Sequence, residues 1–242
     1  MWANGILLLA LSAGLAAQAP DVCNPADLFG PYAFQLTGLT DISGSPRPTA
    51  SLGRIAFGER GSLTGTASAT FRGLLLGNPV TGSYQVKSDC SVIWQLQDTS
   101  GGFQNFSGTL SADGTSVPFR QTDPGGAQHG IMKKLSDTCS SADLEKRYQF
   151  TVSGSTTPMQ PGDVARAVSA KGTLDTAENG SVQVESDCSV RFRLTLQTPD
   201  GRNAGTPPLN MRGFLVGRGK EILAFQTDPG SMVAAHFIAE AK

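Results

Sequence analysis

Few residues in this chain of 242 amino acids have the type and spacing that chemistry requires. Two histidines, His129 and His236, stand at near-matching places after two Asp-Pro-Gly turns, and a histidine near a barrel mouth could act as a general base. No nucleophile stands beside either one by spacing, so the plainer interpretation is a strand residue with one polar neighbour. We assign no catalytic residue.

Two pairs of acids recur at equivalent places, Asp89 with Asp187 and Asp123 with Asp228. Paired carboxylates could carry proton chemistry, but here the two members of a pair belong to separate segments. The simpler role is turn capping, in which the carboxylate accepts a hydrogen bond from the backbone two residues on. Sequence motifs of serine hydrolases, zinc proteases, phosphate loops and dinucleotide sites do not occur.

An internal repeat explains why these histidines and aspartates recur at matching or near-matching places in the chain. Residues 82–92 (GSYQVKSDCSV) return almost unchanged as 180–190 (GSVQVESDCSV), and residues 106–125 match 211–230. Before its Asp-Cys pair the second copy is 18 residues shorter, which is about one β-hairpin. A long repeat that is present twice indicates two duplicated domains or two halves of one barrel.

The four cysteines stand at matching places in the two copies, which selects one of three possible pairings: Cys23 with Cys90 and Cys139 with Cys188. No CxxC spacing and no nearby histidine support a metal site, so we expect disulfides and neither metal nor cofactor.

Residues 1–19 have the pattern of a signal peptide, because the apolar run 6–15 is too short to span a bilayer and small residues follow it. We expect a secreted or periplasmic protein with no membrane insertion after cleavage. A net charge of −1 argues against a nucleic-acid partner, which would need clustered Lys and Arg.

Composition and alternation predict an all-β chain with 29 Gly, 14 Pro and 16% charged residues. From Val190 to Leu196 apolar and polar side chains alternate, which leaves Arg191 and Arg193 on the polar face. We predict two tandem antiparallel up-and-down β-barrel-like repeats, each opened by a short helical turn and stapled by one disulfide. The first repeat covers 20–137 and the second, one hairpin shorter, covers 138–242, with loops at 39–50 and 199–210.

Aromatic residues of the first repeat could line an apolar cavity or form plain core. An eight-stranded barrel is just large enough to fill itself or to hold one small ligand. The candidate lining is Tyr84, Trp94 and Phe106, with His129 as the titratable group that could reach it.

The Gly-x-Tyr-x-Val-x-x-Asp-Cys stretch that ends at Cys90 and the later Thr-Asp-Pro-Gly turns resemble those of small exported bacterial proteins with calycin-type or allene-oxide-cyclase-like barrels. The resemblance covers nearly all of the chain after the signal peptide, here as a tandem duplication. It implies the fold and says little about function. Enzymes of such groups are cyclases with acidic residues inside the barrel, and no residue here can be carried over as catalytic.

Three hypotheses follow. The first is an exported barrel that binds a small apolar molecule. The second is a structural or interaction protein that uses its outer surface, and the third is a barrel cyclase or isomerase. The enzyme hypothesis requires at least two acidic or histidine residues on the inward face of one barrel, where the strand phases place mostly apolar residues. The sequence does not indicate an oligomeric state.

Overall fold

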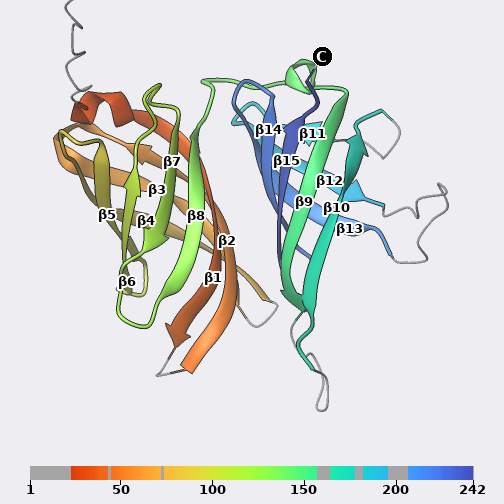
Figure 1. Cartoon of the computed structure of the whole chain (residues 1–242), viewed down its shortest axis with the longest axis horizontal. Helices are drawn as coiled ribbons and strands as arrows, with labels where there is room; N and C mark the ends of the chain where they lie inside the picture. The colour runs from red at the N-terminus through yellow and green to blue at the C-terminus, as the bar shows by residue number, and fades with distance from the viewer. Residues whose placement is uncertain are drawn as a thin grey trace, which may run out of the picture.

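The computed structural model describes residues 23–42, 45–71, 74–156, 164–177, 182–195 and 207–241, which form two β units side by side (Figure 1). The predicted signal peptide lies outside the described residues. Secondary structure in the described ranges consists of strands and short 3-10 turns, so the predicted all-β class is confirmed.

The first unit is a closed barrel of eight antiparallel strands in which each strand pairs with the next and β8 returns to β1. A 3-10 turn, η2 (Glu59–Gly61), connects β2 to β3. The strands are β1 (Gly30–Ile42), β2 (Ser45–Phe57), β3 (Ser62–Phe71), β4 (Leu74–Val86), β5 (Ser91–Asp98), β6 (Phe103–Thr109), β7 (Ser116–Gln121) and β8 (Ala127–Lys134).

The barrel closes because its strands alternate between an apolar inner face and a polar outer face. On β5, Val92, Trp94 and Leu96 are buried, while Ile93 between them is exposed. The same period on the other strands places one apolar layer inside the barrel, and closure leaves no unpaired strand edge.

One end of the barrel is covered by the first 3-10 turn, η1 (Pro25–Leu28). Asn24 and Asp27 form a capping box and Leu28 is fully buried against the core. The disulfide Cys23–Cys90 ties this turn to the β4–β5 connection, as the sequence predicted. The opposite end, where the β1–β2 hairpin projects, is the mouth of the barrel (Figure 1).

The second unit is a sheet of seven strands in the order β10-β9-β15-β14-β13-β12-β11, and the expectation of a second barrel is wrong. This order follows β2-β1-β8-β7-β6-β5-β4 of the barrel, and the described residues of the second unit contain no counterpart of β3. With that strand missing, β10 and β11 do not pair. The strands are β9 (Arg147–Thr156), β10 (Ala167–Asp175), β11 (Gln183–Val184), β12 (Ser189–Leu194), β13 (Leu209–Val216), β14 (Glu221–Gln226) and β15 (Ser231–Ala239).

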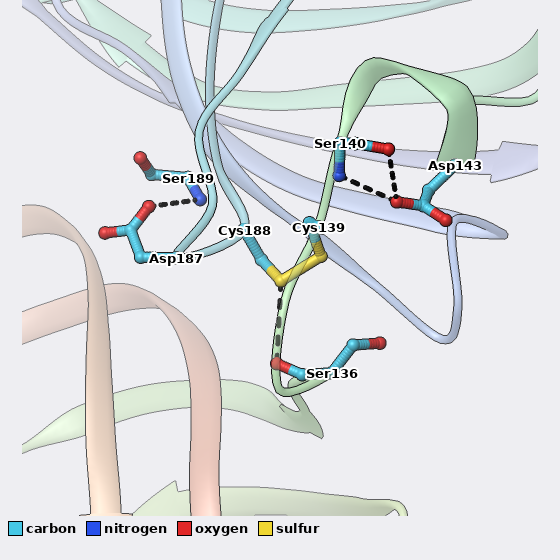
Figure 2. The surroundings of a disulfide bond; sticks show 7 residues. All are labelled: Ser136, Cys139, Ser140, Asp143, Asp187, Cys188 and Ser189. Carbon is cyan, nitrogen blue, oxygen red and sulfur yellow. Dashed lines mark hydrogen bonds between the residues drawn. A yellow bond between two sulfur atoms is a disulfide. The ribbon is translucent and has the colours of Figure 1, made fainter.

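The start of the second unit repeats the arrangement of the first. The 3-10 turn η3 (Ser141–Asp143) begins with a capping box between Ser140 and Asp143, and the predicted disulfide Cys139–Cys188 joins it to the β11–β12 connection (Figure 2). The Cys188 sulfur lies 3.6 Å from the carbonyl oxygen of Ser136 in the segment between the units. Both pairings that the repeat selected are therefore confirmed.

The two units pack through β1, β2, β3 and β8 of the barrel and β13, β14 and β15 of the sheet (Figure 1). Leu52 of the barrel and Leu223 and Phe225 of the sheet belong to one buried apolar cluster. The Gln35 amide Nε2 donates to the carbonyl oxygens of Ala224 and Ala235, at 2.6 and 3.0 Å. A shared apolar cluster and direct hydrogen bonds make the two units one packed body.

Two predicted loops differ from the structure. β1 extends to Ile42 and β2 begins at Ser45, so most of the predicted loop 39–50 belongs to a long hairpin. In the second predicted loop, residues 199–206 lie outside the described residues, and β13 begins at Leu209. Ser and Thr are compatible with strands, and cross-strand pairing overrode the Gly and Pro signals.

Candidate functional site

The closed end of the barrel is filled by packed aromatic rings. Tyr32 and Tyr84 each make an edge contact with Phe57, with ring centroids 5.5 and 4.9 Å apart. The Tyr84 hydroxyl donates to the carbonyl oxygen of Gly58 at 2.8 Å, and burial raises the pKa of this phenol. A satisfied hydroxyl in a packed layer is a structural element of the core.

A second aromatic layer crosses the middle of the barrel. Trp94 stacks on Phe106 at 5.5 Å between ring centroids and contacts Phe119 edge-on at 5.0 Å. These side chains are buried, and together they separate the closed end from the mouth. The barrel is therefore packed over one half only.

Between the aromatic layer and the mouth lies a cup with a volume of about 370 Å³. Its wall comes from the inner faces of seven strands, β1 to β6 and β8, so the site is built by the closed barrel rather than by one loop. The apolar lining consists of Phe34, Leu36, Ala67, Ala69, Leu76, Val80, Leu96, Phe103 and Phe106. The polar lining consists of Thr49, Ser51, Asn78, Asp98, Gln104 and Gln128, with Gly102 at the β5–β6 connection.

Gln128 on β8 is the most deeply buried polar residue of the lining, with 2% of its surface exposed. It faces Gly38 of β1, where an added Cβ would collide with the main chain of β8. Its Nε2 atom is buried and has no hydrogen-bond partner among the described residues. Unpaired buried donors are rare in folded proteins because each one costs stability.

Two exposed apolar residues stand at the rim of the cup. Leu76 is 49% exposed and Phe103 is 54% exposed. Beside them Asp98 closes the β5–β6 turn, where its Oδ1 accepts from the Ser100 hydroxyl and from the N–H groups of Ser100 and Gly102. The Ser100 hydroxyl and these N–H groups hold the pKa of Asp98 below its usual value, so the rim carries a carboxylate.

The structure brings together only part of the predicted site. Phe106 lines the cup and Trp94 stacks on it in the same layer, while Tyr84 pairs with Trp94 across β4 and β5 and packs on Phe57 at the closed end. His129 is exposed on the outer face of β8, next to the inward Gln128. The strand alternation that turns Gln128 inward turns His129 outward, so the expected grouping with the three aromatic residues is not present.

A second hollow, of about 420 Å³, runs over the outer face of β4, β5 and β6. Outward residues such as Gln95 and Asn105 line it, and its lining also includes Tyr84, Trp94 and Phe106, which are direct neighbours across β4, β5 and β6. Asn105 donates to Asp123 at 2.6 Å. The second unit holds the equivalent pair, Asn210 with Asp228, so this clamp belongs to the fold.

The remaining predicted candidates are structural. Asp89 and Asp187 each accept a hydrogen bond at 3.0 Å from the N–H of the serine two residues on, as turn capping requires. Figure 2 shows the bond of Asp187 to Ser189. His236 contacts Glu221, which also binds Lys133 of the barrel, so this histidine belongs to the junction between the units.

Within the described ranges, no group of three or more His, Cys, Asp or Glu residues could hold a metal ion. The described part of the chain also contains no helix that is long and apolar enough to cross a membrane.

Sequence reasoning did not identify Gln128 or the other polar residues of the cup. The signal was the period of β8, because Gln128 shares an inward face with Met132. A glutamine on the apolar face of a strand marks a polar group that the fold places in the core.

Comparison with known proteins identifies no family. No protein-family model and no curated protein matches the chain. A solved structure of a porin-like protein from Bacteroides uniformis aligns with 9% identity over 88% of this chain and 97% of that chain, with a TM-score of 0.16. At this TM-score the likeness carries no argument about fold or function.

Proposed function

We propose that the protein is an exported binding protein whose first unit holds one small, largely apolar molecule in the cup. The observation that carries this proposal is a half-filled barrel: aromatic rings pack one half, and the other half is a cup of about 370 Å³. Ligand sites in proteins typically occupy about 300 to 1,000 Å³ and combine apolar walls with a few polar groups.

The architecture supports this proposal. A closed barrel of eight strands, each paired with its neighbour, is just wide enough to hold one small ligand. Five of the cup residues that are buried are apolar, so a ligand that enters can exchange water for apolar contacts. They are Phe34, Leu36, Val80, Leu96 and Phe106.

We also propose that the protein is exported and that its two units arose by duplication. Two disulfides are typical of proteins that fold in an oxidising compartment, which fits the signal-like residues 1–19 and a secreted or periplasmic location. We infer that the units arose by duplication of one calycin-like barrel, with loss of the counterpart of β3 from the second. Matching disulfides and a matching strand order support this inference.

Binding through the outer surface is the second candidate function. Ile93 is exposed on β5 and lines the outer hollow over β4, β5 and β6. The cyclase hypothesis has less support, because the described lining of the cup contains one carboxylate, Asp98. This carboxylate already accepts a hydrogen bond from the Ser100 hydroxyl in its own turn.

The proposal is tested by a ligand screen that reads the fluorescence of Trp94 in the full chain carrying Trp2→Phe. Trp94 stacks on Phe106, which lines the cup, so neutral apolar molecules should change its emission saturably. Ala67→Leu narrows the cup and should abolish the response, whereas Thr66→Leu on the exposed face of the same strand should preserve it. A response that both variants retain, or no response to any compound, would contradict the proposal.

A further inference from the structure

One side chain indicates the chemistry of the ligand. Gln128 lines the cup, and only 2% of its surface is exposed. Its Nε2 donor has no hydrogen-bond partner in the described part of the chain. Such a donor destabilises the free protein and would gain a hydrogen bond from an acceptor that it can reach once the amide turns toward the cup.

The second unit has no amide at the equivalent position. Its equivalent residue is Val233, which faces Gly154 on β9 as Gln128 faces Gly38 on β1. Val233 is buried in the apolar core of that unit. A buried amide in the unit with the cup, where the equivalent residue of the sheet is valine, points to binding.

The charge of the lining restricts the ligand further. Asp98 is the one ionisable residue among those that line the cup, and its turn keeps it ionised. No Lys, Arg or His belongs to this described lining, so an anion would meet a carboxylate and no compensating cation.

We propose that the cup selects a neutral ligand with an apolar body and a carbonyl oxygen at its buried end, and that the Gln128 amide donates a hydrogen bond to this oxygen. Rotation about the last side-chain bond of glutamine, whose torsional minimum is broad, turns the amide toward the cup. The apolar body then packs against Leu96 and Phe106. This inference rests on the proposed function of the cup.

Three probes that share one ring system test it: 2-acetylnaphthalene, 2-ethylnaphthalene and 2-naphthoate, each titrated into the full chain and followed by NMR. The ketone should bind about tenfold more tightly than the hydrocarbon, because it satisfies the buried donor, and the carboxylate should bind most weakly. Gln128→Met keeps the side-chain length and removes the donor, so the ratio of ketone to hydrocarbon affinity should fall to about one. Gln85→Met changes an exposed amide on the outer face of β4, outside the cup, and should leave the ratio unchanged.

The outcomes separate this inference from the function on which it rests. Equal binding of ketone and hydrocarbon, or a ratio that Gln128→Met does not change, overturns the carbonyl inference and leaves the cup as an apolar binding site; a water bound to Gln128 would give this result. If none of the three probes binds in the cup, both the inference and the proposed function fail.

Discussion

The equivalent strands β7 and β14 differ in their outer faces: the outer side chains of β7 are exposed to solvent, and those of β14 are buried. On β7 burial alternates, and Pro118 and Arg120 are exposed. On β14 the residues at the matching places, Leu223 and Phe225, are buried, so that strand is apolar on both faces. A strand with two buried faces loses the alternation that marks a surface strand. Burial on the outer side of β14 shows where one unit packs on the other.

The contact between the units uses a different face from each. The barrel contributes Ala33 and Leu52, whereas the sheet has Gln149 and Lys171, both exposed, at the equivalent positions. A head-to-tail contact of this kind can continue indefinitely unless the outer faces differ. Pro118 and Arg120 of the barrel and Gln149 and Lys171 of the sheet are exposed where the other unit has its contact residues, so neither exposed face repeats the apolar contact.

The interiors differ as well. In the second unit Phe237 replaces Met132 of the barrel, and it is fully buried against Phe150 and Phe192. Val233 replaces Gln128 in the same sheet face. The barrel interior holds a cup and a buried polar group, whereas the sheet interior at these positions is packed with apolar side chains.

The largest expected effect comes from breaking the contact between the units. Phe225→Ala removes a fully buried ring from the shared cluster and should lower the free energy of unfolding by about 3 to 5 kcal/mol. The matched change Arg120→Ala, on the exposed face of β7, should alter it by less than about 0.5 kcal/mol. Urea unfolding followed by circular dichroism measures both. Equal effects would mean that the two strands do not differ as described.

A smaller effect is expected at the edge of the same contact. The hydrogen bond from His236 and the nearby Lys133 lower the pKa of Glu221 from 4.5 to about 2. Because the folded pKa is lower, the stabilisation is complete above pH 4.5 and is lost as the pH falls toward 2. Glu221→Gln should therefore cost about 2 kcal/mol at neutral pH and progressively less below pH 4.5. Urea unfolding between pH 7 and about pH 2 follows the difference.

Its control is Ser116→Ala, at the equivalent position of the barrel strand β7. That change should cost the same at every pH. If Glu221→Gln lowers the free energy of unfolding by the same amount at every pH, the stabilisation does not come from the ionised carboxylate of Glu221.

The smallest expected effect comes from exchanging residues between the two interiors. Gln128→Val removes an unpaired buried donor and should stabilise the free protein by about 1 kcal/mol. Val233→Gln places an amide in an apolar core and should destabilise it by about 2 kcal/mol. If urea unfolding shows that Gln128→Val stabilises the protein and Val233→Gln destabilises it, the amide has a functional role in the barrel and none in the sheet. Destabilisation by Gln128→Val would instead assign Gln128 a structural role.

Local signals in the sequence predicted much of the fold. The repeat selected both disulfides, and the residues after Cys23 and Cys139 predicted capped turns that the structure contains. Turn chemistry also predicted the roles of Asp89 and Asp187. Each of these features depends on residues close in sequence or on a repeat that can be read directly.

The site was less predictable because it depends on closure and register. The 18-residue difference indicated a missing hairpin, but not that the second unit stays an open sheet. His129 and His236 seemed to match, yet pairing places them at different positions, with Ala234 equivalent to His129. Gln128 lies inward only once the register of β8 against β1 is fixed.

The central claim, that the barrel binds a ligand and the sheet does not, is tested most directly by NMR of the full ¹⁵N-labelled chain with 2-acetylnaphthalene. The account predicts shifts of the Gln128 side-chain amide and of backbone amides near Leu96 and Phe106, and no shift at Val233 or Phe192. Shifts confined to the second unit or to the junction between the units, with the Gln128 amide unchanged, would contradict it.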